Sequence, residues 1–328
     1  MLWALLTDFR RWGAVRTITA LDPRFEGRIP GVSRDTLPAD EVVSASHAGH
    51  QEIYRSLLSR SDCVIIIAPE TAGILAGLTN QAESAGIPVL GSASSAVVTA
   101  GDKALSCRLF QSARLPIPRT IAVDFASAPK TAEQMDYPLI IKPVDGIGSE
   151  GVCRADCFSD VRAVLDLVRP FTSSDQILLQ PFVDGTPVSV SLLVSGGRCA
   201  PLSLNRQLVE TGRQFRYLGS QVPFEHKESS RAIELACSSV RLVPGLSGYV
   251  GVDLIIAGDS CMLIEINPRL TTSYIGLRQV AVSNLAEAIV KACLEGVLPE
   301  RFQLSGQVTI RKDDPEKWGR YPISAFGK

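Results

Sequence analysis

The apolar positions of the first hundred residues follow two alternating spacings. Residues 1–12 carry apolar side chains at 2, 3, 5, 6, 9 and 12, the spacing of one face of an amphipathic helix. The expected elements after it are a strand over 15–21, a helix near 51–60, a strand over 63–68, a helix near 71–85 and a strand over 88–91. This alternation predicts α/β layering. Open parallel sheets normally begin with a strand, so the leading helix suggests a first strand that is absent or lies upstream of an alternative start.

A second unit begins at Asp102-Lys103, which opens another helical segment. That segment ends before Leu115-Pro-Ile-Pro118, where two prolines force an extended backbone. The expected strands beyond it are 138–143, 151–154, 177–182, 187–195, 198–204, 249–257, 261–266 and 307–310, with helices near 159–169, 228–243 and 280–294. We therefore expect an N-terminal α/β domain over 1–101, a small subdomain over 102–179, a larger subdomain over 180–310 and a charged tail over 311–328.

Composition and charge narrow the class of protein. The chain has 328 residues, of which 45% are hydrophobic and 20% charged, which is enough for a core in two or three subdomains. Its 33 basic and 34 acidic residues leave a net charge of -1, so no overall field would attract nucleic acid or an anionic membrane. No run reaches the roughly 18 apolar residues of a membrane span, and residues 1–12 lack the shape of a cleavable signal. A cytoplasmic protein that acts on small molecules is expected.

Cysteine and histidine give weak signals for a metal site. Several of the eight cysteines lie in apolar runs such as the one that begins at Cys63, which is typical of buried free thiols. Cys153 and Cys157 lack a second pair at zinc-ribbon spacing. His47 and His50 are three apart, but Gly49 and the missing third ligand favour a surface loop.

A glycine-rich turn follows the buried strand that ends at Lys142. The turn contains Gly146, Gly148, Ser149 and Gly151. Such a turn lets backbone N–H groups approach phosphate oxygens, while Lys142 supplies a positive charge. The glycines also fit the dinucleotide fingerprint G-x-G-x-x-G, but that motif needs a helix at the glycines, and Val152-Cys-Arg is strand-like. A hairpin turn without function is the other alternative, and a lysine at the strand end argues against it.

Two acidic strands form the second candidate site. Side chains alternate along a strand, so Glu265 and Asn267 share one face, and Asp253 on the preceding strand can join them. Oxygen ligands of this kind suit Mg²⁺, which completes its shell with water and phosphates. Arg269 follows directly and can stabilise charge on a transferring phosphoryl group. The alternative, a solvated strand face at Glu265, is weakened by the combination of acid, Asn, Pro and Arg.

Taken together, these motifs resemble the ATP-grasp superfamily over roughly residues 60 to 310. The motifs, in order, are Asp102-Lys103, Lys142-Pro143 with its glycine loop, Gln180-Pro-Phe-Val183 and Glu265-Ile-Asn-Pro-Arg269. The resemblance implies an ATP-grasp fold, with a Rossmann-like pre-ATP-grasp domain and two α+β subdomains that grip ATP. It implies that Lys103 and Lys142 contact ATP phosphates under the loop 146–151. It further implies that Asp253, Glu265 and Asn267 hold Mg²⁺, or alternatively Mn²⁺, and that Lys142 and Arg269 are catalytic.

The resemblance also places the adenine and ribose of ATP. The hinge formed by Gln180, Pro181, Phe182 and Val183 would receive adenine, mainly through backbone groups. Many family members have Glu where this chain has Gln180, and an acid for the ribose some residues later. Here Thr186-Pro187 fills that region, which leaves Asp184 as the nearest candidate.

Further segments resemble the branch of the family whose ligases join tyramine to glutamate for methanofuran-type cofactors. These segments are Ala68-Pro-Glu-Thr71, Leu90-Gly-Ser92, Thr99-Ala-Gly-Asp-Lys103, Leu204-Asn-Arg-Gln207 and Asn267-Pro-Arg-Leu-Thr-Thr-Ser-Tyr274. The resemblance implies that a carboxylate is phosphorylated to an acyl phosphate, which an amine then attacks. The rival functions are an ATP-grasp ligase for another acid and amine, and an ATP-binding regulatory module without turnover, which the intact acidic cluster argues against. A homodimer stays possible.

Six residues are candidates for contacts with the acid and the amine. They are Glu70, Asn205 and Arg206 for polar contacts, and Phe215, Tyr217 and Tyr274 for an aromatic ring. An acidic substrate favours a guanidinium such as that of Arg206 or Arg269. Each candidate has a structural alternative: helix capping for Glu70, a polar strand end for Asn205 and Arg206, and the core for the aromatic residues.

Overall fold

The computed structural model describes residues 1–25, 33–45, 49–146 and 148–312. Its N-terminal elements are α1 (Leu2–Trp12), β1 (Ile18–Leu21), β2 (Glu41–Ser44), α2 (His50–Leu58), α3 (Ile74–Ser84) and α4 (Ser94–Gly101). β1 and β2 form a parallel two-stranded sheet. The predicted strands 63–68 and 88–91 do not form as strands, and among the described residues they are joined by one parallel bridge, Val64 to Val89. His50 begins α2 instead of lying in a surface loop, and His47 is outside the described residues.

A small antiparallel sheet forms the second unit. After α5 (Lys103–Ser112), its elements are β3 (Ile121–Asp124), α6 (Ala128–Ala132), β4 (Leu139–Pro143), β5 (Cys153–Ala155), α7 (Val161–Val168) and β6 (Gln176–Pro181). The strand order is β3-β6-β4-β5. Leu139, Ile141 and Leu179 pack against Val164 and Val168 of α7, because apolar side chains recur on one face of each element. The predicted subdomain boundary after residue 179 falls inside β6.

The third unit is an antiparallel sheet in the order β11-β10-β7-β8-β9-β12. Its strands are β7 (Thr186–Ser195), β8 (Arg198–Glu210), β9 (Arg216–Val222), β10 (Gly248–Ala257), β11 (Ser260–Asn267) and β12 (Val308–Arg311). Its helices are α8 (Ser229–Val240), α9 (Ser273–Val280) and α10 (Leu285–Val290). A π-helical segment (Lys291–Glu295) extends α10. The predicted helix near 280–294 therefore starts five residues later, and α9 precedes it. The sequence reasoning missed β2, β3, β9, α4, α6 and α9.

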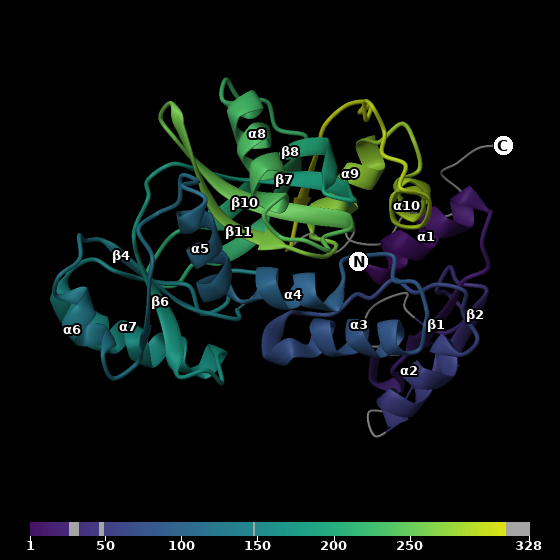
Figure 1. Cartoon of the computed structure of the whole chain (residues 1–328), viewed down its shortest axis with the longest axis horizontal. Coiled ribbons are helices and arrows are strands. Elements are labelled where there is room, and N and C mark those ends of the chain that lie inside the picture. Colours follow the sequence, from purple (N-terminus) through teal and green to yellow (C-terminus); the bar gives the residue numbers. More distant parts are fainter. Residues whose placement is uncertain (26–32, 46–48, 147, 313–328) are drawn as a thin grey trace.

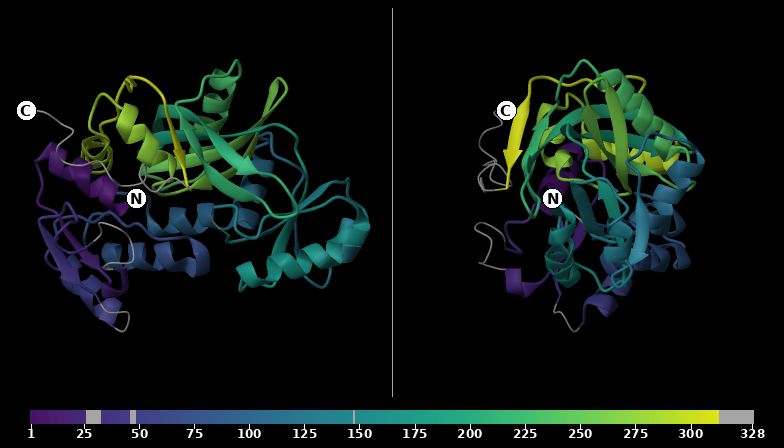
Figure 2. Two further views of the ribbon diagram at one scale, coloured as in Figure 1. Left: turned by 180° about the vertical axis from the view of Figure 1, so that it is seen from behind. Right: turned by 90° about the vertical axis from the view of Figure 1, so that its left-hand side faces the viewer.

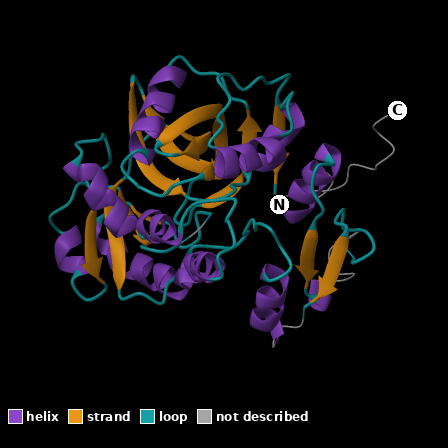
Figure 3. Cartoon of the chain, turned by 45° about the vertical axis from the view of Figure 1, so that its right-hand side comes forward, coloured by secondary structure: helices purple, strands orange, loops and turns teal. Residues whose placement is uncertain are grey.

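Alternation along β7 separates the two faces of this sheet. Val188 and Val190 face an apolar core that also contains Leu235 and Ala236 of α8, whereas Ser189 points to the opposite face. Figure 1 shows α8 lying across the strands, and Figure 2 shows the unit with α6 and α7 and the unit with β1 and β2 at opposite ends of the long axis. Figure 3 shows three separate sheets, each with helices beside it.

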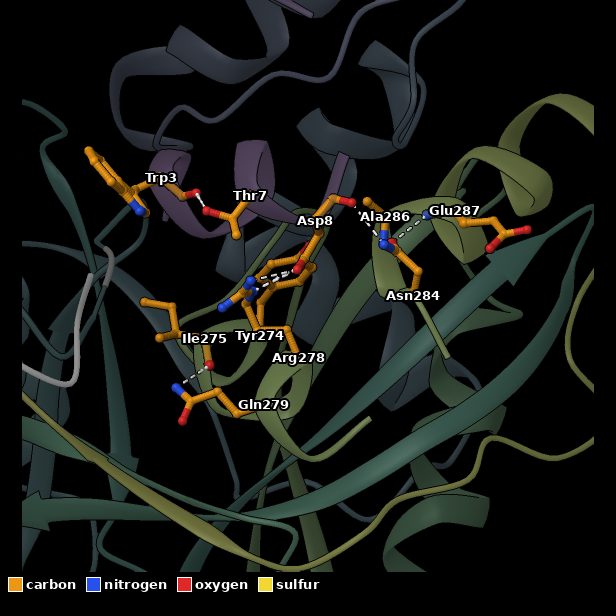
Figure 4. Close-up of polar contacts among 10 residues, drawn as sticks. All are labelled: Trp3, Thr7, Asp8, Tyr274, Ile275, Arg278, Gln279, Asn284, Ala286 and Glu287. Carbon is orange, nitrogen blue, oxygen red and sulfur yellow. Dashed lines mark hydrogen bonds and ion pairs between the residues drawn. The ribbon is translucent and has the colours of Figure 1, made fainter. Parts of the chain in front are cut away.

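Helix α1 packs against both the N-terminal strand β1 and the C-terminal helices α9 and α10. Its Leu6 packs near β1, while Leu5 and Phe9 enter the core formed by α9 and α10. Asp8 forms an ion pair of 2.6 Å with Arg278, and both side chains are less than one-tenth exposed. Tyr274 Oη donates a hydrogen bond of 2.7 Å to the same carboxylate (Figure 4). Tyr274 is therefore a core residue, which decides the alternative that the sequence left open.

All eight cysteines are free thiols, as the sequence suggests. Within the described ranges, no helix is long and apolar enough to cross a membrane. The tail beyond Lys312 lies outside the described residues.

Candidate active site

A cavity of about 440 Å³ opens between the four-stranded sheet and the polar face of the six-stranded sheet. Most of the residues singled out in the sequence line it: Lys103, Lys142, Gly146, Gly148, Ser149, Gln180, Pro181, Phe182, Val183, Asp184, Asp253, Glu265, Asn267 and Arg269. The glycine turn and the acidic strands among them belong to different subdomains and are far apart in sequence. Tertiary packing thus joins the glycine turn to the acidic strands.

The acidic residues come together through strand register. Asp253 of β10 is paired with Glu265 of β11, and Asn267 lies two residues further along the same face. Asn267 Nδ2 donates a hydrogen bond of 3.2 Å to Asp253 Oδ2. Burial and the neighbouring charge of Glu265 raise the pKa of Asp253 to about 7. Two carboxylates thus share a partly buried site that favours a cation.

The two lysines have different electrostatic surroundings. Lys103 Nζ lies 3.0 Å from Glu265 Oε2 and donates a hydrogen bond of 2.7 Å to the Gly146 carbonyl. Burial opposes its charge, but the carboxylates of Glu265, Glu70 and Asp253 together outweigh burial and raise the pKa of Lys103. Lys142 is 4% exposed, and burial lowers its pKa. No side-chain hydrogen bond joins Lys142 Nζ to another described residue, so its donors are available to an anionic ligand.

Arg269 is oriented by an acid outside the cavity wall. Its Nε lies 2.7 Å from Glu70 Oε2, and the Glu70 side chain is only 7% exposed. Glu70 does not line the cavity, and it makes no side-chain cap bond to the helical turn that follows it. The structure therefore gives Glu70 neither of the roles considered from the sequence. Instead, it fixes the guanidinium of Arg269.

Two glycines of the glycine-rich turn differ in the space around them. Gly151 has φ of +69°, and a Cβ there would lie 2.7 Å from Phe171 Cβ, so this glycine permits packing instead of lining the cavity. Gly148 has φ of +58°, and no atom lies within 4 Å of its missing Cβ. The base of the turn is held by Thr71 Oγ1, which donates to the Asp145 carbonyl at 3.1 Å. Residue 147 is outside the described ranges.

The hinge presents backbone and aromatic surface. Gln180 Nε2 donates a hydrogen bond of 2.5 Å to Thr120 Oγ1, so this side-chain donor already has a partner. The Phe182 ring meets Phe215 edge to face at 6.2 Å, and both rings line the cavity. This part of the cavity suits a planar ring system. Asp184 also lines the cavity, and its contact with ribose stays a prediction.

The structure does not bring Asn205 or Arg206 to the cavity wall. Asn205 is fully buried and bonded to neighbouring serines, and Arg206, on the other face of β8, lies 5.8 Å from the Phe224 ring. Gln207 and Val209, two and four residues beyond Asn205, reach the cavity instead. The period of two in a strand is the signal that relates these positions. Ser189 and the segment 271–273 also line the cavity and were missed.

This chain is similar in sequence to known proteins. The ATP-grasp domain family matches residues 100–273, and the pre ATP-grasp 3 domain matches residues 15–97. The tyramine--L-glutamate ligase of Methanocaldococcus fervens is 34% identical over 231 residues, 70% of this chain and 65% of that protein. The enzyme of that name from Methanocaldococcus jannaschii is 33% identical over 247 residues, 75% of this chain and 67% of that protein. The chain thus spans about two thirds of the length of these relatives.

A solved structure supports the same fold. The biotin carboxylase–β,γ-ATP complex of Campylobacter jejuni superposes with a TM-score of 0.77 at 16% identity, covering 93% of this chain and 71% of that chain. The expected α/β fold, with a pre-ATP-grasp domain and an ATP-grasp domain, is confirmed. Because the ATP-grasp domain alone matches more than half of its residues, this chain belongs to the ATP-grasp family.

Proposed function

We propose that this chain is an ATP-dependent carboxylate-amine ligase that joins L-glutamate to tyramine or a similar aryl-ethylamine. The observation that carries the proposal is the joining of Lys142, the acidic pair and Arg269 in one cavity. The similarity to proteins named tyramine--L-glutamate ligase supports the choice of acid and amine.

The oxygen groups around Asp253 suit Mg²⁺. Among the described residues, no three His, Cys, Asp or Glu side chains gather as a metal cluster. The site instead has two carboxylates and the amide of Asn267, and Mg²⁺ commonly takes one or two carboxylates together with waters and phosphate oxygens. Burial and the neighbouring charge of Glu265 raise the pKa of Asp253, and a bound cation would offset both. When bound, Mg²⁺ would neutralise charge on the phosphates, and Mn²⁺ accepts the same donors.

The side chains of the cavity then have distinct tasks. Lys103 and Lys142 would bind phosphate oxygens under the glycine turn. Adenine would lie at the hinge beside Phe182. Arg269, held by Glu70, would stabilise the transferring phosphoryl group.

The reaction balances in two steps. An oxygen of the glutamate side-chain carboxylate bonds to the γ-phosphorus of ATP as the bond from phosphorus to the ADP oxygen breaks. The products are an acyl phosphate and ADP. The amine nitrogen then bonds to the acyl carbon while the carbon–oxygen bond to phosphate breaks. Of the three ammonium protons, one stays on the amide, one goes to phosphate and one goes to solvent.

The wall beyond the acidic cluster supports an aromatic amine. Tyr217 and Val209, which are partners on β9 and β8, line this part of the cavity, whereas Phe215 lies at the hinge with Phe182. Burial raises the pKa of Tyr217 to about 12, so its phenol stays protonated and can exchange hydrogen bonds with a ligand hydroxyl.

The test is ADP release from ATP and Mg²⁺ with a panel of acids and amines, followed by mass analysis of the amide. Glutamate with tyramine should be the most active pair, and Glu265→Gln should abolish turnover. Glu210→Gln, which changes an exposed acid of the same fold unit, is the matched control. ADP release with another pair only would overturn the substrates and retain the ligase. ATP binding without ADP release for any pair would favour the regulatory module.

A further inference from the structure

A connected set of hydroxyl groups lies beneath the cavity floor. Asn205 Nδ2 donates to Ser191 Oγ at 3.0 Å and to Ser189 Oγ at 3.4 Å. Asn205 Oδ1 accepts from Ser203 Oγ at 2.8 Å. Both amide protons of Asn205 are therefore used, one toward each of two serines. Two branches of hydrogen bonds start from this amide.

Each branch ends at the cavity. In the first, Ser189 Oγ lies 3.3 Å from Ser273 Oγ, and both residues line the cavity. In the second, Ser191 Oγ lies 2.7 Å from the Tyr249 hydroxyl, which lies 3.2 Å from Thr271 Oγ1. Thr271 alone among these three lines the cavity.

Counting protons gives each branch one spare donor. The first branch has two hydroxyl protons and one mutual bond, and the second has three protons and two mutual bonds. Burial raises the pKa of Tyr249 to about 12, so its phenol keeps its proton. A buried hydroxyl proton without an acceptor costs about 1 to 3 kcal/mol. The spare protons therefore belong at the cavity, on Thr271 in one branch and on Ser189 or Ser273 in the other.

The backbone holds Thr271 in place for this task. A Cβ at Gly251 would lie 2.4 Å from Thr271 Cγ2, so only glycine on β10 lets the threonine lie against the sheet. Gly251 stands between Tyr249 and Asp253 on the cavity face of the strand. The spare donors thus lie beside the acidic cluster and Arg269.

We propose that Thr271 and the Ser189–Ser273 pair bind the carboxylate of the acid substrate that is not activated, and that Asn205 is their positioning residue. The inference rests on the proposed ligase function and deepens it. Two hydroxyl donors match the two oxygens of a carboxylate. The substrate class is therefore an acid with a second carboxylate, such as an amino dicarboxylic acid.

The decisive experiment crosses protein variants with substrate analogues. Thr271→Val removes the donor and keeps the shape, whereas Thr271→Ser keeps the donor. With L-glutamate, Thr271→Val should lower kcat/KM about 10- to 100-fold, as expected for a hydrogen bond to a charged group, and Thr271→Ser should restore most of it. With 4-aminobutyrate, which lacks the second carboxylate, the same change should have less than about a twofold effect. The KM for ATP should not change.

Asn205→Asp tests the positioning role. An aspartate offers acceptors where the amide offers donors, so the two serines would turn their protons inward and the spare donors would be lost. Glutamate use should fall at least as far as in Thr271→Val. Ser239→Ala is the control, because Ser239 is equally buried but lies in α8 and donates to the Ala236 carbonyl.

Binding measurements separate this proposal from the ligase proposal. Titration of L-glutamate and 4-aminobutyrate, with Mg²⁺ and a non-hydrolysable ATP analogue, needs no turnover. Tighter binding of glutamate that Thr271→Val abolishes supports the subsite even if no amide forms. Equal losses for both acids, or a loss confined to ATP, would overturn it. A best substrate without a second carboxylate would do the same.

Discussion

Replacing Asp253 by Asn should stabilise the apoprotein while it removes activity. The carboxyl group lies partly buried in the cavity wall, and its pKa is raised from 3.8 to about 7. The folded state therefore binds more protons than the unfolded state between these pH values, and its stability falls as pH rises from about 4 to 7. Each unit of difference between the folded and unfolded pKa is worth about 1.4 kcal/mol. The carboxyl group therefore lowers the free energy of unfolding by at most about 4 kcal/mol at pH 8 and by about 1.5 kcal/mol at pH 5.

Asparagine does not ionise, so the Asp253→Asn variant does not lose this stability. The entropy of unfolding of 328 residues is about 0.7 kcal/mol/K. Dividing the gain in unfolding free energy by this entropy gives a rise in Tm of at most about 6 °C at pH 8 and about 2 °C at pH 5. Thermal unfolding of both proteins without metal or nucleotide from pH 5 to pH 8 measures it. Asp175→Asn, at a side chain that is 85% exposed, should change Tm little at either pH. An unchanged or lower Tm for Asp253→Asn at pH 8 would refute the assignment of buried charge.

The other predictions concern a lysine, a turn and an ion pair. Lys142→Met should lower the rate of ADP release by about 10² to 10³, measured at saturating ATP, because one charged donor is lost. Gly151→Ala should lower Tm more than Gly148→Ala, since the first adds a Cβ within 2.7 Å of a neighbouring side chain and the second meets no atom within 4 Å; equal shifts would contradict this. Asp8→Ala should cost about 3 to 5 kcal/mol in urea unfolding because it leaves Arg278 buried without that carboxylate, and Asp8→Leu with Arg278→Leu should recover part of the loss.

The sequence by itself determined the elements whose signals are local. The helix over residues 1–12, the strand that leads to Lys142 and the hairpin that carries Asp253 and Glu265 all follow from apolar periodicity and turn residues. The period of two along a strand also placed Glu265 and Asn267 on one face. That reasoning needs only neighbours in the chain or in one hairpin.

Tertiary structure decided every feature that depends on distant partners. Periodicity shows that Asn205 and Arg206 lie on opposite faces of a strand, but only the sheet register shows that Asn205 lies beneath the floor while Gln207 reaches the cavity. Glu70 is 199 residues from Arg269, and their ion pair has no local signal. The hydroxyl branch that ends at Thr271 likewise combines three strands and a loop, so its donors can be counted only in the folded chain.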